Sequence, residues 1–165
     1  SGVAAVLLAA QKAAAQKGGR PVPVLLTNGE ELGCRGAKTG GFALLGKVGC
    51  AVSVDVSFGN FPGCEPEHTA VLGTGAMVGV SPVLSGKVTA ALKRLAKQNN
   101  IPFTLEVMGS NTSTNADVLS VTGGGMAAGL VSIPLRNMHT PCEVINLNDL
   151  AAVANLLAQF CKEGC

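Results

Sequence analysis

The stretch "CAVSVDVS", residues 50–57, decides the fold class of this chain. Apolar and polar residues alternate along it, which is the pattern of a β-strand with one face in the core. Asp55 ends this alternating run, and a carboxylate in an apolar strand needs a partner. The sequence leaves two kinds of partner open for Asp55, a metal ion or backbone N–H groups.

Strands and helices alternate along the rest of the chain. Short β-rich runs predict further strands at residues 21–27, 68–75, 103–108 and 127–134. Apolar residues at helical spacing predict helices at residues 3–16, 81–99, 114–121 and 146–161. We therefore predict one α/β domain over residues 1–165, with a largely parallel or mixed sheet.

The composition argues against several classes of function. Only 13% of the residues are charged and the net charge is +2, which is too weak and too scattered for nucleic-acid binding. Trp and Tyr are absent and Phe numbers 5, so stacking platforms for bases or sugars are largely missing. The first apolar run is too short to span a membrane and lacks a basic leader, so we expect a cytoplasmic protein without a membrane partner.

The cysteines predict no metal knuckle and no disulfide framework. None of the six forms a C-x-x-C pair, and a chain this large and apolar does not need disulfides for stability. We expect reduced, mostly buried thiols, with the last two near a loose tail. The six are Cys34, Cys50, Cys64, Cys142, Cys161 and Cys165.

The predicted first helix, residues 3–16, is apolar over most of its surface. A helix that is apolar nearly all round belongs inside a larger structure. We therefore expect the chain to associate with a missing amino-terminal segment or with other subunits.

Carboxylates and an imidazole stand where three of the predicted strands end. Glu30 and Glu31 follow the first strand, Asp55 ends the second, and His139 lies just beyond the last. Ligands of α/β sheets bind beyond the carboxyl ends of the strands, so we expect these four side chains to converge.

Adjacent glutamates on a turn point in different directions, which allows a division of roles. One of them can bind a metal ion while the other acts as a general base on metal-bound water. A solvated turn is the alternative reading of this pair. His139 is either a zinc ligand or a structural histidine. The residues alone leave these alternatives open.

Two other reaction classes lack sequence support. The glycine-rich stretches at 73–79 and 122–129 do not have the spacing and following helix of a dinucleotide-binding site. The chain also has no G-x-S-x-G motif for a serine nucleophile.

Four segments together resemble the M42 family of metallo-aminopeptidases. They are "VLLTNGEELGCRGA" at 24–37, "AVSVDVS" at 51–57, "LGTGAMVGVSPVL" at 72–84 and "SIPLRNMHTPCEVINLNDL" at 132–150. Their order and spacing agree with the family from residue 1 to about residue 160. The chain is thus similar to part of the catalytic domain of this family.

The resemblance implies a three-layer phosphorylase/hydrolase-like α/β fold, with a mixed sheet between helices and a portion missing at the amino end. It implies a dinuclear site for zinc or cobalt, in which Glu30 is the general base. Glu31 and His139 would bind one ion, and Asp55 the other. The family cleaves amino-terminal residues from peptides, commonly as large homo-oligomers, and some members are labelled endoglucanases.

The chain departs from the family pattern at several places. A bridging Asp and a further His ligand of the family lie upstream of the residues present, so three of five implied ligands remain. Asn115 stands where the family usually has Asp, Asn137 where it has Tyr, and Gly29 where Gln is common. The chain is therefore either a partial catalytic domain or an inactive relative that serves as a binding or structural subunit.

Overall fold

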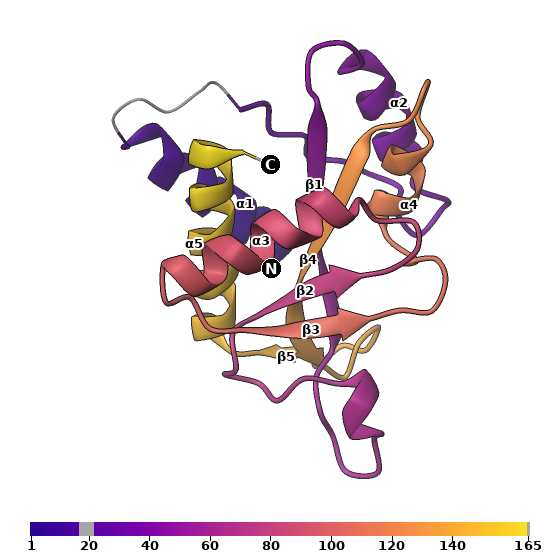
Figure 1. Cartoon of the computed structure of the whole chain (residues 1–165). Helices are drawn as coiled ribbons and strands as arrows, with labels where there is room; N and C mark the ends of the chain where they lie inside the picture. Colours follow the sequence, from indigo (N-terminus) through magenta and orange to yellow (C-terminus); the bar gives the residue numbers. More distant parts are fainter. Residues whose placement is uncertain (17–21, 165) are drawn as a thin grey trace.

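The computed structural model describes residues 1–16 and 22–164, built around one twisted five-stranded sheet (Figure 1). The sheet has the order β1-β4-β2-β3, with β5 paired to β4. β1 is parallel to β4, β2 is parallel to β3, and β2 and β4 are antiparallel. The strands are β1 (Cys50–Phe58), β2 (Ala76–Val80), β3 (Phe103–Val107), β4 (Ala127–Arg136) and β5 (Val144–Ile145). The predicted α/β class with a mixed sheet is confirmed.

β4 is the centre of the sheet because it pairs with three other strands. Its residues 128–135 are all buried, and its sequence AAGLVSIPLR is apolar almost throughout. Such a continuous apolar run is typical of a strand covered on both faces. β4 pairs with β1 over nine residues, from Cys50 opposite Ala127 to Phe58 opposite Leu135.

Helices cover both faces of the sheet, which gives three layers. One apolar core joins α1 (Gly2–Ala14), α3 (Gly86–Gln98) and α5 (Leu147–Glu163) to the sheet. A smaller core joins α2 (Arg35–Ala43) and α4 (Asn115–Ser120) to the other face. Figure 1 shows α1 and α5 side by side, with α3 crossing near them.

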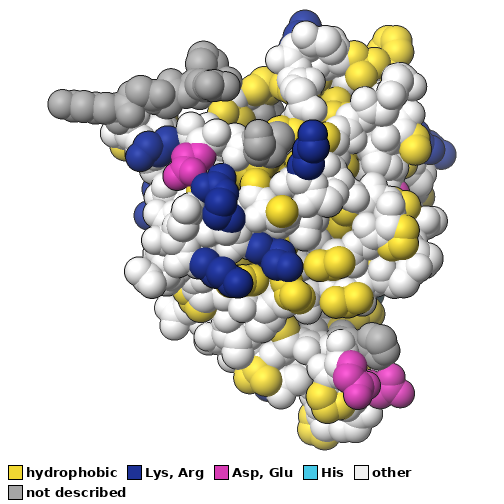
Figure 2. Space-filling model, in the orientation of Figure 1, with side chains coloured by type: hydrophobic (Ala, Val, Ile, Leu, Met, Phe, Trp, Pro, Cys, Tyr) yellow, Lys and Arg dark blue, Asp and Glu magenta, His cyan; other side chains and the backbone are white. Residues whose placement is uncertain are grey.

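The outer surface of α3 is basic. Figure 2 shows Lys and Arg side chains gathered over this helix. One of them, Arg94, pairs with Glu163 of α5 at 3.0 Å, which ties the two helices together at the surface. This face lies on the side of the sheet that carries the larger core.

The glycine-rich loop before β2 has a structural role. The carboxylate of Asp149, which is fully buried at the start of α5, accepts the N–H groups of Gly73 and Gly75, both at 2.7 Å. Gly75 has φ +102°, and a Cβ on it would lie 2.0 Å from the Pro102 carbonyl oxygen. Only glycine fits there.

Two predicted strands are wrong. Residues 22–27 of the first run form no strand, and residue 21 lies outside the described residues. No described strand lies beside them to pair with their backbone. In the run 68–75, turns and the Asp149 contact hold the chain, apart from a single bridge between Ala70 and Gly59, and β2 begins at residue 76.

Element boundaries differ from the prediction in two further places. Ser81 and Pro82 lie in a turn, so α3 begins at Gly86, after its N-cap Ser85, and not at residue 81 as predicted. Asp55 does not end its strand, because β1 runs on to Phe58. The sequence prediction also omitted α2, whose sequence RGAKTGGFA contains glycines that disfavour a helix.

The cysteine prediction is corrected in one respect. Four of the described cysteines are half-buried and Cys142 is exposed, so the described thiols are not mostly buried. Cys165 lies outside the described residues. Among the described helices, none has the length and apolar character required to cross a membrane.

Candidate active site

Glu30 and Glu31 lie on a rigid turn between the irregular segment and α2. The Glu30 carbonyl oxygen accepts the N–H groups of Gly33 at 3.0 Å and Cys34 at 2.8 Å. The first N–H groups of α2 are donated to the Asn28 and Gly29 carbonyls. These bonds fix the backbone that carries both carboxylates.

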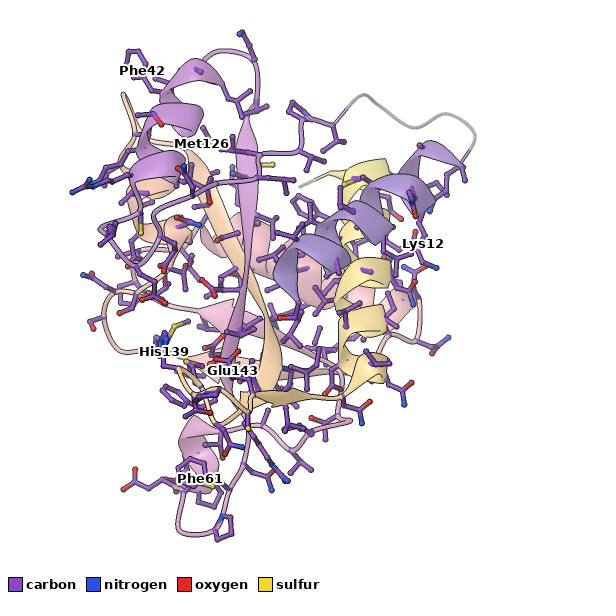
Figure 3. The ribbon with its side chains drawn as sticks, turned by 180° about the vertical axis from the view of Figure 1, so that it is seen from behind. Lys12, Phe42, Phe61, Met126, His139 and Glu143 are labelled. Carbon is purple, nitrogen blue, oxygen red and sulfur yellow. The ribbon has the colours of Figure 1, made fainter. Side chains whose placement is uncertain are left out.

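His139 lies in a tight loop that follows β4, where Figure 3 shows it next to Glu143. The His139 N–H donates to Glu143 Oε1 at 2.8 Å. Asn137 and His139 have φ values of 60° and 61°. Left-handed backbone is uncommon for residues other than glycine and clusters at functional sites. The loop therefore holds His139 in a costly but defined position.

The structure brings Glu31 and His139 together. Glu31 Oε1 is 3.5 Å from His139 Nδ1, and the two side chains are 73% and 69% exposed. Two ligand atoms of a tetrahedral zinc ion, each about 2.0–2.1 Å from the metal, lie roughly 3.4 Å apart. An oxygen and an imidazole nitrogen also match the donor types that zinc prefers. The pair thus fits two positions of one ion.

Asp55 lies within electrostatic reach of this pair. Burial raises the pKa of Asp55, a hydrogen bond from the Val56 N–H at 2.8 Å opposes that shift, and the Glu31 carboxylate adds to it. The charge of His139 lowers the pKa of Asp55. A carboxylate that burial and a like charge destabilise favours a nearby cation.

Glu30 is within electrostatic reach of two other acidic groups, Asp55 and Glu31. Burial raises the pKa of Glu30, and the carboxylates of Asp55 and Glu31 raise it further. The Cys34 thiol donates to Glu30 Oε1 at 3.7 Å and opposes the shift. A raised pKa suits a general base, which works best with a pKa near the operating pH.

The four predicted side chains share one large cavity. It has a volume of about 1070 Å³ and is lined by Glu30, Glu31, Asp55 and His139, by residues 22–27, and by parts of α1 and β1. Within the described ranges 1–16 and 22–164, no three His, Cys, Asp or Glu side chains are gathered closely enough to hold a metal ion. The ligand assignment therefore stays a prediction, with Glu31 and His139 as the only pair in direct contact among the described residues.

Sequence reasoning missed three residues of this region. Cys34 contacts Glu30, and Glu143 holds the backbone of His139. Glu106 of β3 lies near Asp55 on the same face of the sheet and accepts hydrogen bonds from the hydroxyls of Ser57 and Ser132. A signal for Glu106 existed, because it is a carboxylate inside the apolar strand "FTLEVM", as Asp55 is in its own strand.

The departures from the family pattern also have structural positions. Asn115, the first residue of α4, donates its Nδ2 to Thr27 Oγ1 at 3.1 Å and so ties α4 to the irregular segment. Its Oδ1 is buried and has no hydrogen-bond partner among the described residues. Asn137 Nδ2 donates to the Cys142 carbonyl at 3.1 Å and closes the His139 loop.

The chain is similar in sequence to known aminopeptidases. The sequence model of the M42 glutamyl aminopeptidase family matches residues 1–156. A lysyl aminopeptidase from Pyrococcus furiosus is 31% identical over 134 residues, which are 81% of this chain. The chain spans 38% of the length of that relative.

Solved structures share the fold. An aminopeptidase from the archaeon Desulfurococcus kamchatkensis superposes with a TM-score of 0.75 at 31% identity, over 82% of this chain and 39% of the other. The Pyrococcus horikoshii TET1 peptidase, which can assemble into a tetrahedron or a large octahedral shell, gives a TM-score of 0.64 at 24% identity. That match covers 84% of this chain and 40% of the peptidase and shows the fold alone. The chain belongs to the M42 glutamyl aminopeptidase family.

Proposed function

We propose that this chain is part of the catalytic domain of a metal-dependent aminopeptidase that removes amino-terminal residues from peptides. The observation that carries the proposal is the contact of 3.5 Å between Glu31 and His139, on the wall of the cavity that Glu30 and Asp55 also line. The names of the family and of the P. furiosus relative support an aminopeptidase activity. They differ in the residue removed, glutamyl or lysyl, so the residue preference is left open.

Two divalent ions, zinc or cobalt, are proposed for the complete site. Glu31 and His139 would hold one ion, and Asp55 would contribute to the other. Bound ions of this kind supply a Lewis acid and a water molecule of lowered pKa. The donor set of carboxylates and imidazole is suited to that chemistry.

Glu30 is the proposed general base and acid. Its carboxylate would accept a proton from the attacking water and deliver it to the leaving amine. The Cys34 thiol restrains its Oε1, and its backbone is held by the turn before α2. Glu30 therefore has both a fixed position and a raised pKa for this role.

A further part of the protein or another subunit is proposed to cover the cavity. Its wall includes Val22, Val24, Leu25 and Leu26, which are 37–52% exposed, and the only described partner of β1 along its length is β4. An exposed apolar surface of this kind marks an interaction site. We propose further copies of the protein, in a homo-oligomer, as one cover for this exposed apolar surface.

An inactive binding or structural subunit is the second candidate. It is favoured by the absence of any three-residue metal cluster within residues 1–16 and 22–164. An endoglucanase activity is disfavoured by the composition, because the sequence has no Trp or Tyr to stack on sugar rings.

The test compares wild type with Glu30→Gln in the presence of cobalt and the segment that completes the site, using aminoacyl-nitroanilides as substrates. Glutamine keeps the shape but cannot accept the proton, so turnover should fall about 10²-fold or more while metal content is unchanged. Equal turnover of both forms would remove Glu30 from the mechanism. Absence of turnover in both forms would favour the inactive subunit.

A further inference from the structure

The face of the sheet beneath the site carries two buried hydroxyls beside Asp55. Ser132 of β4 is the register partner of Asp55 on β1, so their side chains stand on the same face. Ser57 lies two residues beyond Asp55 and shares that face. The two serines are only 1% and 8% exposed. Both hydroxyls are thus neighbours of the Asp55 carboxylate.

Glu106 of β3 accepts hydrogen bonds from both of these hydroxyls. Ser132 Oγ donates to Glu106 Oε2 at 2.7 Å, and Ser57 Oγ donates to Glu106 Oε1. The register partner of Glu106 on β2 is Gly79, and β2 lies between β3 and β4 in the sheet. The carboxylate therefore links the edge strand to the two strands nearest the site.

Asp55 is left with few protein hydrogen bonds as a result. Among the described residues, its carboxylate accepts one hydrogen bond, from the Val56 N–H to Oδ1. Oδ2 accepts none from that part of the chain. A hydroxyl that was not held by Glu106 would have Asp55 as its nearest acidic acceptor on this face, because Ser132 is the cross-strand neighbour.

We propose that Glu106 is a positioning residue for Asp55, which holds the Ser57 and Ser132 hydroxyls away from Asp55 so that its Oδ2 stays open to a divalent cation. The assignment rests on the proposed function, because it takes Asp55 as a cation ligand. It follows from three contacts, the two serine bonds to Glu106 and the single bond to Asp55. Residues around metal ligands commonly change metal affinity 10- to 100-fold when removed, about the size of effect expected here.

The test is a cobalt titration of the full chain together with the segment that completes the site, monitored by the visible absorbance of the bound ion. Glu106→Ala frees both hydroxyls and should weaken cobalt binding about 10-fold or more. The triple variant Glu106→Ala, Ser57→Ala, Ser132→Ala removes the competing hydroxyls, so its affinity should recover most of the loss. Glu163→Ala removes an exposed carboxylate on the opposite face and serves as the matched control, with unchanged binding.

A role of Glu106 in stability alone would give a different result. The triple variant would then bind cobalt no better than Glu106→Ala, and this outcome would overturn the assignment. Equal binding of cobalt by Glu106→Ala and wild type would also overturn it.

Glu106→Gln is a second variant, which keeps the side-chain volume in case the alanine variant does not fold. Its amide can accept only one of the two hydroxyl protons, so binding should weaken about threefold, and no change would also contradict the proposal. Wild type that binds no cobalt would overturn the metal site itself, and this assignment with it.

Discussion

Two apolar runs of this chain look alike in sequence but differ in secondary structure and in burial. Residues 127–134 form most of β4 and are almost wholly buried, whereas residues 22–27 form no strand and expose most of their apolar side chains. β4 has β1 and β2 on its two sides, while the first run has no strand beside it in the described part of the chain. The difference shows that an apolar run needs a pairing partner as well as a β-rich composition to become a strand.

The most direct way to break this comparison is to truncate one leucine in each run. Leu130→Ala removes a fully buried side chain and should lower the free energy of unfolding by about 2–5 kcal/mol. Leu26→Ala removes a side chain that is 52% exposed and should cost less than about 1 kcal/mol. Urea unfolding of both variants measures the contrast. Equal losses would show that the first run is packed in solution, against a partner or another segment.

A third run, 68–75, sharpens the comparison because a distant side chain holds part of it. Asp149→Ala leaves the N–H groups of Gly73 and Gly75 without their acceptor, so unfolding should become easier by roughly 2–3 kcal/mol. Asp149→Asn keeps one acceptor oxygen and should lose less. Thermal unfolding of the two variants measures the loss of stability. An Asp149→Ala variant as stable as wild type would show that other contacts hold the loop in place.

The smallest expected effect concerns the polar contacts of the sheet, which Glu106 makes with Ser57 and Ser132. Burial raises the pKa of Glu106, the hydroxyls of Ser57 and Ser132 oppose the shift, and Asp55 adds to it. The folded state therefore holds this proton more tightly than the unfolded state does. Protonated Glu106 therefore adds to the free energy of unfolding at acidic pH. This contribution is lost as the pH rises from about 4.5, the ordinary pKa of a glutamate, through the raised pKa of the folded state.

Glu106→Gln removes this titration, so the stability difference between wild type and variant should shift by about 1 kcal/mol or less in favour of the variant between acidic and neutral pH. Urea unfolding at several pH values measures that difference, with Glu163→Gln as the exposed control. A difference that does not change with pH would show that Glu106 titrates alike in the folded and unfolded protein.

The sequence predicts much of the fold because the core elements have strong local patterns. β1, β3, β4, α4 and α5 lie close to their predicted positions. The helix α2 was missed because its glycines disfavour a helix locally, yet Gly41 allows the close approach of Leu119 from α4. Such long-range packing leaves no periodic signal in the sequence.

The candidate site was predictable only in part for a related reason. Glu30, Glu31, Asp55 and His139 could be named from their positions near the ends of predicted strands and from the family resemblance, although residues 22–27 form no strand and β1 continues past Asp55. The role of Glu106 depends on the order of the strands, because β3 reaches β1 only across β2 and β4. The order of the strands in the sheet cannot be read from the sequence, so the sequence alone does not connect Glu106 with Asp55.

The central claim is that Glu31 and His139 hold one divalent ion together, and a double-mutant cycle on cobalt affinity tests it most directly. Glu31→Gln, His139→Ala and the double variant are titrated with cobalt beside wild type, each together with the segment that completes the site. If both residues bind the same ion, either single change should weaken binding about 10²-fold or more, and the second change should add little. Affinities that match wild type, or two losses that simply add, would contradict the claim.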